Sequence, residues 1–175
     1  VFGPDAWPVS TLLPEPAGRA LQQALEAAGV RFRLHTTARR IDRHDGGFRI
    51  ELHNGDVFEA DLLLSAVGLR PDTRLAAATG LAVGRGIVTD RLLRTSAPRV
   101  YALGDCAEVD GMNLPYVMPI MHAARALAKT LAGDPAPVRY PAMPVVIKTP
   151  SLATVVSPPP RHAAGSWEHA GSGPD

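Results

Sequence analysis

The chain of 175 residues is 46% apolar and has a formal net charge of +1, so its length allows one to one and a half domains with a sizeable core. The nearly balanced charge excludes a strong electrostatic attraction to nucleic acid or an anionic membrane, and the longest apolar runs are too short to span a bilayer. A single cysteine excludes a disulfide framework, which agrees with a reducing cytoplasm, and the six histidines lack the paired spacing of a metal site.

The first third of the chain predicts a helix followed by strands. Between Pro14 and Gly29, apolar residues recur at helical spacing, which predicts an amphipathic helix ended by Gly29. Val30 to Leu34 then predicts a strand of the parallel type. From Ala38 to Ala66 the apolar period changes to two, which predicts a three-stranded antiparallel meander.

Two turn signals divide this meander. Asp45-Gly46-Gly47 predicts one turn, and Asn54-Gly55-Asp56 predicts a type I′ hairpin. The meander leads into the apolar run Ala60 to Val67, which is typical of a central strand covered on both faces. Gly68 has no side chain, so another group can lie close to its backbone. That group is either a neighbouring strand packed tightly against it or a nucleotide.

The next stretch predicts a turn, a short helix and a strand. Arg70-Pro71-Asp72 forms an extended turn, because a residue before proline avoids the helical region. Thr73 to Leu81 predicts a short helix ended by Gly80, and Gly86 to Asp90 predicts a strand.

A second apolar run, Val100 to Leu103, predicts a short buried strand that stops at Gly104-Asp105. A carboxylate is thereby expected at the carboxyl end of a strand, where ligands bind in open α/β sheets. An ionised carboxylate accepts hydrogen bonds and donates none, so it suits the hydroxyls of a sugar or ribitol and repels phosphate. Taken alone, the two residues Gly104-Asp105 indicate no more than a turn.

A helix is predicted shortly after this acidic turn. Residues 107–116 predict a loop, Val117-Met118-Pro119 opens the helix, and Gly133 closes it after Leu131. The free N–H groups and positive dipole end at its start favour an anionic or electron-rich group. A carboxylate for a polyol followed by such a helix start suits a flavin nucleotide.

Several segments resemble one class of enzymes. Thr95 to Asp105 resembles the second flavin fingerprint, T-x-x-x-x-h-Y/F-A-x-G-D, of the two-dinucleotide-binding flavoprotein reductases. Leu62 to Asp72 resembles the connecting motif of the same group, h-h-h-x-A-x-G-x-x-P-[ND]. Within that group, the segments most similar to rubredoxin–NAD(+) reductases are Gly104 to Glu108, Leu114 to Pro119 and Val146 to Pro150.

The resemblance implies a fold and a domain plan. The fold class is α/β, with parts of two Rossmann-like domains, one for FAD and one for NAD(P)H, and the antiparallel meander between strands of the latter. Residues 1–70 would be the carboxyl-terminal half of the NAD(P)H-binding domain and 71–142 the carboxyl-terminal part of the FAD-binding domain. Residues 143–160 would be the start of a truncated carboxyl-terminal domain. Residues 161–175 are expected to be a flexible tail.

The resemblance also implies an activity and a site. It predicts hydride transfer from NADH to FAD, then single electrons to rubredoxin or a similar small iron protein, in the cytoplasm, without a catalytic acid, base or metal. The implied FAD contacts are Gly104, Asp105, Val117, Met118 and Lys148, and the implied NAD contacts are Val67 and Gly68. Lys148 has an alternative role as an edge-strand lysine that discourages aggregation.

Alternatives to this activity stay open. No G-x-G-x-x-G turn occurs and the first residue is Val1, so we expect the carboxyl-terminal part of a longer enzyme, without the turns that approach each pyrophosphate. A second hypothesis is a non-catalytic fragment or binding module. A third retains the enzyme with ferredoxin, a quinone or nitrite as acceptor. The sequence does not distinguish these acceptors, NADH from NADPH, or the oligomeric state.

Overall fold

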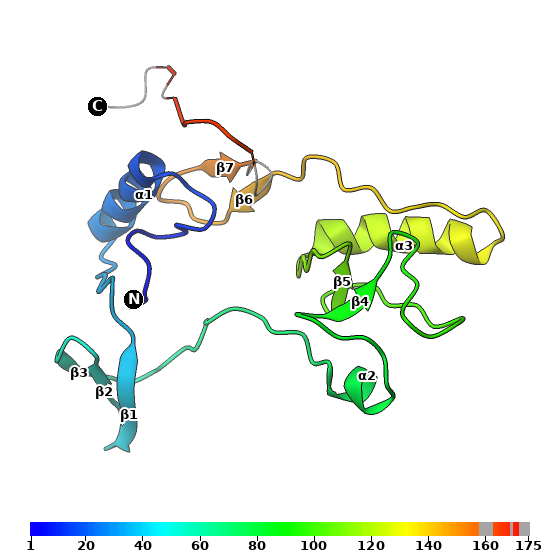
Figure 1. Cartoon of the computed structure of the whole chain (residues 1–175). Helices are drawn as coiled ribbons and strands as arrows, with labels where there is room; N and C mark the ends of the chain where they lie inside the picture. Colours follow the sequence, from blue (N-terminus) through cyan, green and yellow to red (C-terminus); the bar gives the residue numbers. More distant parts are fainter. Residues whose placement is uncertain (158–162, 169, 172–175) are drawn as a thin grey trace. The chain divides into compact units, whose positions relative to one another are not determined.

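A computed structural model describes residues 1–157, 163–168, 170 and 171, which divide into two compact units (Figure 1). The first unit comprises residues 1–65 and the described part of 144–175, and the second comprises residues 66–143. Helices occur with both antiparallel and parallel sheets, so the predicted α/β class is confirmed. Within the described residues, no helix has the length and apolar character needed to cross a membrane.

Helix α1 (Glu15–Ala27) confirms the first predicted helix. Pro14 precedes it in an extended conformation, and Gly29 leaves it with a φ of +93°, a conformation that favours glycine. Its apolar face buries Leu21, which contacts Leu13 and Val156 in a hydrophobic cluster of the first unit. The helix is therefore held against the two-stranded antiparallel sheet of β6 (Val145–Ile147) and β7 (Thr154–Val156).

The strand predicted at Val30 to Leu34 is wrong. Only Arg33 makes a bridge, a parallel one to Phe2. Its carbonyl accepts a hydrogen bond from the Gly3 N–H at 3.2 Å, and its N–H donates to the Val1 carbonyl at 2.8 Å. A single bridge leaves the rest of the segment without the repeated pairing that defines a strand.

The predicted three-stranded meander is confirmed. Strands β1 (Ala38–His44), β2 (Gly47–Leu52) and β3 (Val57–Ala60) form an antiparallel sheet in the order β1-β2-β3. The central strand β2 places Ile50 and Leu52 in full burial, which is the reason the alternation of its sequence specifies the register.

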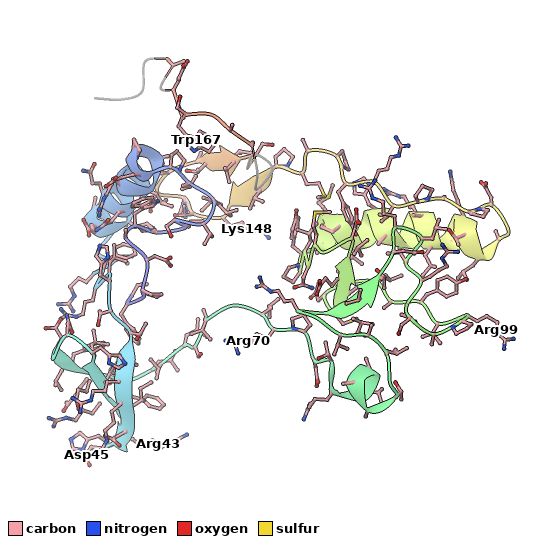
Figure 2. The ribbon with its side chains drawn as sticks, in the orientation of Figure 1. Arg43, Asp45, Arg70, Arg99, Lys148 and Trp167 are labelled. Carbon is pink, nitrogen blue, oxygen red and sulfur yellow. The ribbon has the colours of Figure 1, made fainter. Side chains whose placement is uncertain are left out.

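The type I′ turn of the meander joins β1 to β2 at Asp45-Gly46, whereas the sequence predicted it at Asn54-Gly55. Asp45 and Gly46 both have positive φ, of 40° and 84°, as a type I′ turn requires. Figure 2 labels Asp45 at this turn. At the second turn only Gly55 has positive φ, so the prediction for Asn54-Gly55 is wrong. The Asn54 side chain instead accepts a hydrogen bond from the Asp56 N–H at 3.2 Å, and the loop has three residues with glycine last.

The central strand predicted at Ala60 to Val67 is wrong beyond the end of β3. Residues 61–72 contain no strand, and the exposed fractions of Leu62, Leu64 and Val67 are 82%, 83% and 94%. A strand buried on both faces needs paired edges and covering layers, and no described residue pairs with this segment. The apolar run is therefore extended and open to solvent.

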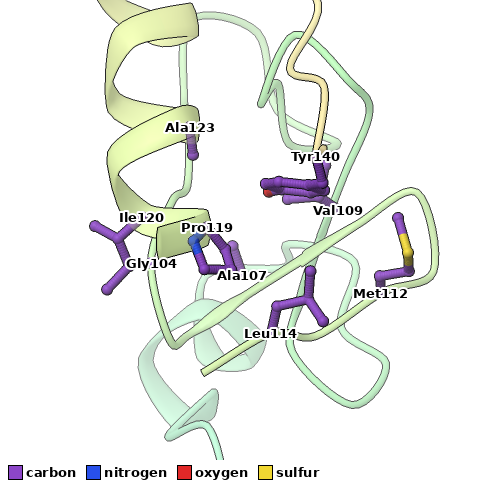
Figure 3. Close-up of a pocket in the computed structure, with 9 residues that line it drawn as sticks. All are labelled: Gly104, Ala107, Val109, Met112, Leu114, Pro119, Ile120, Ala123 and Tyr140. Carbon is purple, nitrogen blue, oxygen red and sulfur yellow. The ribbon is translucent and has the colours of Figure 1, made fainter. Parts of the chain in front are cut away.

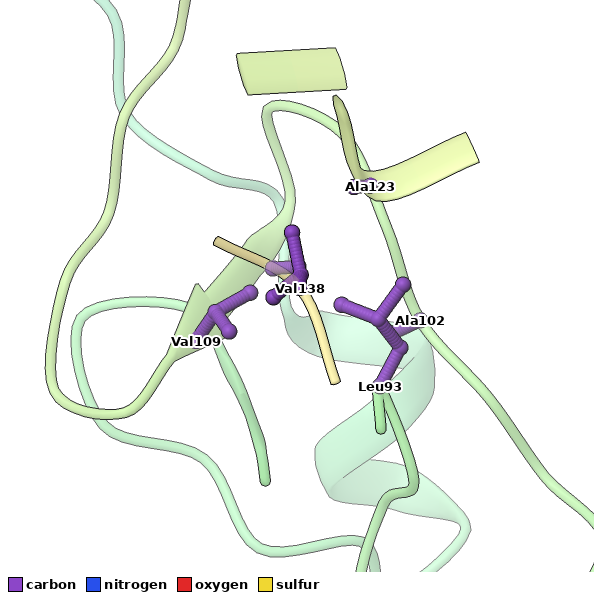
Figure 4. Packing of buried hydrophobic residues seen from close by; sticks show 6 residues of the cluster. Leu93, Ala102, Val109, Ala123 and Val138 are labelled. Carbon is purple, nitrogen blue, oxygen red and sulfur yellow. The ribbon is translucent and has the colours of Figure 1, made fainter. Parts of the chain in front are cut away.

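The second unit contains two short parallel strands and two helices. Strands β4 (Ile87–Thr89) and β5 (Ala107–Val109) pair in parallel, and α2 (Arg74–Ala78) precedes them. Helix α3 (Val117–Leu131) follows β5. The predicted elements at Thr73 to Leu81, Gly86 to Asp90 and Val117 to Leu131 are confirmed. Figure 4 shows the core of this unit, in which Leu93, Ala102, Val109, Ala123 and Val138 are buried together.

The strand predicted at Val100 to Leu103 is wrong, and the strand of this region is β5. Val100 to Leu103 turns back on the preceding segment, so Tyr101 makes one antiparallel bridge to Arg94. The Ala102 N–H donates to the Leu93 carbonyl at 3.1 Å, and Arg99 takes a φ of +64° at the bend. Asp105 consequently precedes a strand and does not end one.

The carboxyl-terminal predictions fall partly outside the described residues. Of the tail predicted at 161–175, residues 161, 162, 169 and 172–175 lie outside them, as do the last three residues of the segment 143–160. The described residues 163–168, 170 and 171 contain neither helix nor strand.

We predict that Gly86→Ala will destabilise the second unit by about 1–3 kcal/mol through overpacking. A Cβ on Gly86 would lie 2.7 Å from the Cys106 carbonyl oxygen and 3.0 Å from the Ala107 carbonyl carbon, both backbone atoms of the β4–β5 pair. Gly3→Ala, in the first unit, is the control, because a Cβ there would meet no atom within 4 Å and Gly3 does not have a positive φ. Urea titrations followed by NMR signals of Val109 and Ala123 measure both variants, and equal midpoints would contradict the packing argument.

Candidate functional site

The acidic turn, Gly104 to Ala107, is anchored to strand β4. Gly104 has a φ of +88°, and its carbonyl accepts a hydrogen bond from the Ala107 N–H at 3.0 Å, which closes the turn. The Cys106 carbonyl accepts from the Ile87 N–H at 2.8 Å, so the turn is joined to the parallel pair. Asp105 is exposed on this turn and makes no ion pair among the described residues. Its carboxylate is therefore available to hydroxyl donors.

The start of helix α3 has free backbone donors. Tyr116 precedes it with an extended φ of −154°, and no side chain caps the first turn. Val117 and Met118 are 70% and 48% exposed, whereas Pro119 is buried and has no N–H to satisfy. The N–H groups of the first turn, together with the helix dipole, favour an electron-rich acceptor at this point.

The acidic turn and the start of α3 line one small cavity of about 10 Å³ (Figure 3). Gly104 and Ala107 line it from the turn, Pro119 and Ala123 line it from the helix, and Tyr140 closes it. This volume is about that of a single water probe, so the cavity is a packing seam and not a ligand pocket. It shows that two elements predicted to hold one nucleotide lie against each other, with Asp105, Val117 and Met118 on exposed surface.

One residue of this site was missed by sequence reasoning. The Asn113 side-chain amide donates to the carbonyl oxygens of Asp105 and Ala107, both at 2.9 Å. The Asn113 Oδ1 atom is buried without a partner among the described residues. The sequence signal that could have located Asn113 is the preceding pair Asp110-Gly111, which is typical of a tight turn. Both residues have positive φ, of 51° and 76°, and the turn folds the chain back along β5.

The other predicted contacts, Lys148, Val67 and Gly68, lie in other segments of the chain. Lys148 directly follows β6 and is exposed (Figure 2), but it belongs to the first unit, whereas Asp105 and Val117 belong to the second. Both β6 and β7 are edge strands of a two-stranded sheet, so the alternative role of Lys148 as an edge lysine also fits.

Val67 and Gly68 lie in the open segment that follows the meander. Gly68 has a φ of +90°, and a Cβ built on it would meet no atom within 4 Å. Tight packing against a neighbouring strand is therefore wrong for Gly68 among the described residues. Its contact with a nicotinamide nucleotide stays a prediction, as does that of Val67, which is exposed.

Asp72, the last residue of the connecting motif, forms an ion pair with Arg74 at 2.7 Å. The side-chain hydrogen bond from Arg74, aided by the backbone N–H of Arg74, lowers the pKa of Asp72 to about 2. The same pair raises the pKa of Arg74. The ion pair therefore fixes the turn that opens α2 and stays ionised throughout the neutral range.

Comparison with known proteins identifies the family. The family model described as pyridine nucleotide-disulphide oxidoreductase matches residues 6–129, and that described as rubredoxin binding C-terminal domain matches residues 137–175. Because the first match covers more than half of the chain, this chain belongs to the pyridine nucleotide-disulphide oxidoreductase family. The resemblance inferred from the motifs is thereby confirmed.

Individual relatives agree with this assignment. The rubredoxin-NAD(+) reductase of Alcanivorax borkumensis is 51% identical over 158 residues, which cover 90% of this chain and 41% of that protein. The rubredoxin-NAD(+) reductase of Acinetobacter baylyi is 47% identical over 163 residues, covering 92% and 42%. The solved ferredoxin reductase for the CYP199A2 system of Rhodopseudomonas palustris superposes with a TM-score of 0.76 at 28% identity, covering 81% and 37%. The chain spans about two fifths of the length of the curated relatives it matches.

We predict that a ¹³C NMR titration of the Asp72 carboxyl will give a midpoint near 2, and that Arg74→Gln will return it toward the ordinary value of 3.8. The folded-state pKa is lowered, so the stabilisation by this pair is present above about pH 4 and is lost as the pH falls toward 2. Arg70→Gln, in the same turn, is the control and should leave the midpoint unchanged. A wild-type midpoint near 3.8 would show that the ion pair does not persist in solution.

Proposed function

We propose that this chain supplies part of the flavin site of an NADH-dependent reductase that passes electrons to rubredoxin. The observation that carries the proposal is the contact between the acidic turn at Gly104-Asp105 and the uncapped start of α3, which line the same cavity. A polyol and an electron-rich ring edge are joined in a flavin nucleotide, and this pair of elements presents one group for each.

Each of these elements has a distinct role in the proposal. The exposed carboxylate of Asp105 accepts hydrogen bonds from hydroxyls of the sugar or ribitol, for which Gly104 leaves backbone space. The N–H groups at Val117 and Met118 donate to the pyrimidine edge of the ring system. When bound, FAD supplies the conversion from two-electron exchange with NADH to one-electron exchange with an iron protein. The chain positions this group, and none of its residues is assigned acid or base chemistry.

Further contacts belong to the same proposal. The ammonium group of Lys148, which is exposed after β6, stabilises negative charge at the pyrimidine end of the flavin. The open segment at Val67-Gly68 contacts the nicotinamide nucleotide, and the positive φ of Gly68 gives a backbone without a side chain at that point.

The electron acceptor in this proposal is rubredoxin. The support is the match of residues 137–175 to a rubredoxin-binding domain, together with the names of the two relatives. We place the protein in the cytoplasm, because its one cysteine is free and two relatives are named rubredoxin-NAD(+) reductases.

We predict that FAD titrated into the isolated chain will bind weakly and saturably, and will shift the NMR signals of Gly104, Asp105, Val117 and Met118. Asp105→Asn removes the charge of a carboxylate acceptor, and charge-assisted hydrogen bonds contribute about 1.5–3 kcal/mol, so affinity should fall roughly tenfold or more. Asp110→Asn is the matched control, since it removes a charge from the same loop at a left-handed position that asparagine tolerates.

Three results would separate the hypotheses. Stoichiometric flavin absorbance in the purified chain would mean that this part alone retains FAD. Shifts confined to other residues, or equal affinities of the Asp105 and Asp110 variants, would overturn the assigned site. No binding at any FAD concentration would favour a non-catalytic fragment.

A further inference from the structure

The chain returns sharply along the outer edge of β5. Asp110 and Gly111 form a turn with positive φ at both positions, and the pair Val109 and Met112 exchanges N–H to carbonyl hydrogen bonds in both directions, each at 2.9 Å. This is the geometry of a type I′ turn, in which the flanking residues lie directly opposite each other. Asn113, the next residue, is therefore brought back beside the start of β5.

On the outer edge of β5 the Val109 carbonyl accepts from the Met112 N–H, and the carbonyls of Asp105 and Ala107 accept from the side chain of Asn113. Successive carbonyls of a strand point in opposite directions, and the Cys106 carbonyl faces β4, where it accepts from the Ile87 N–H. The carbonyls of Asp105 and Ala107 face the other way. The Asn113 amide has two N–H donors, and its nitrogen lies 2.9 Å from each of these oxygens.

The orientation of the Asn113 side-chain amide follows from its hydrogen-bond partners. Reversing the amide would place Oδ1 against two carbonyl oxygens, so the nitrogen must face the turn. Oδ1 is left buried without a partner among the described residues, which is unfavourable for stability. The net contribution of Asn113 to folding is thus smaller than two hydrogen bonds suggest, and its main effect is geometric.

The same residue stands at the base of helix α3. Asn113 precedes the helix cap Tyr116 by only Leu114 and Pro115, and the Tyr116 N–H donates back to the Leu114 carbonyl at 2.9 Å. Proline stiffens this short link further. Any rotation of the acidic turn relative to the start of α3 must therefore break the amide contacts or deform the link.

We infer that Asn113 is a positioning residue of the flavin site, which holds the Asp105 turn and the amino end of α3 at a fixed separation through its side-chain amide. The inference rests on the proposed function for its ligand, but the coupling of the two elements is a property of the chain itself. Asn113 does not touch the ligand in this arrangement and acts through the backbone of Asp105 and Ala107.

The test compares four variants of the full 175-residue chain. Asn113→Leu removes both donors at similar size, and Asn113→Asp removes them at neutral pH but regains one O–H donor when its carboxyl is protonated. Asn54→Leu and Asn54→Asp are matched controls, because Asn54 lies in a turn of the meander in the first unit. FAD affinity is measured for each at pH 7.5 and pH 5, below every variant's melting temperature, relative to wild type at the same pH.

At pH 7.5 both Asn113 variants should bind FAD roughly tenfold more weakly than wild type, which corresponds to the loss of one to two hydrogen bonds. The two carbonyl oxygens that face position 113 disfavour an ionised carboxyl and so raise the pKa of Asp at this position above its ordinary value of about 3.9. At pH 5 the affinity of Asn113→Asp should therefore recover in part, whereas that of Asn113→Leu should not recover. A role confined to stability would lower the melting temperature without this split between affinities. Unchanged affinity in Asn113→Leu would overturn the inference.

A second readout needs no flavin. In the ligand-free chain, Asn113→Leu should shift or broaden the amide signals of Asp105, Ala107 and Val117 together, while signals of α1 stay unchanged. If wild type binds no FAD, the proposed function fails for this chain, and the coupling is judged from these signals alone. Unchanged signals at both Asp105 and Val117 would overturn it.

Discussion

The parallel pairing of β4 with β5 is the constraint on which the second unit depends. Its strands have only three residues each, so each backbone hydrogen bond is a large share of the hydrogen bonds that join them. The Ile87 N–H donates to the Cys106 carbonyl, and Gly86 lies so close to the same backbone that no side chain fits there. The Glu108 carboxylate adds a hydrogen bond from the Gly86 N–H at 3.0 Å. These contacts anchor the turn that carries Asp105 to the sheet, where it lines a small cavity together with α3.

Helices and local turns were predictable, because their signals lie within the segments themselves. The periodicity at 14–29 and 117–131 located α1 and α3, and the alternation in β2 located the meander. The two apolar runs at 60–67 and 100–103 were misassigned for a common reason. An apolar run becomes a strand only when a partner edge is present, and neither run finds more than isolated bridges beyond β3.

The site was partly predictable for the same reason. Asp105 and the start of α3 are close in sequence, so the turn and the helix cap identified them together. Asn113 escaped because an amide in a loop has no distinguishing pattern until the Asp110-Gly111 turn brings it back to the backbone of Asp105. The type I′ prediction also fell on the wrong pair, since Asn54 bonds locally to Asp56 and keeps negative φ, whereas Asp45 takes the left-handed conformation.

The open segment from Leu62 to Leu69 has a consequence for handling the isolated chain. Its large apolar side chains are exposed, and its backbone N–H and carbonyl groups have no partners among the described residues on either edge. An extended apolar segment with two vacant edges is a template for pairing with another extended chain. Self-association through this segment is therefore expected to rise with protein concentration while both units stay folded, because these eight residues lie outside both hydrophobic clusters.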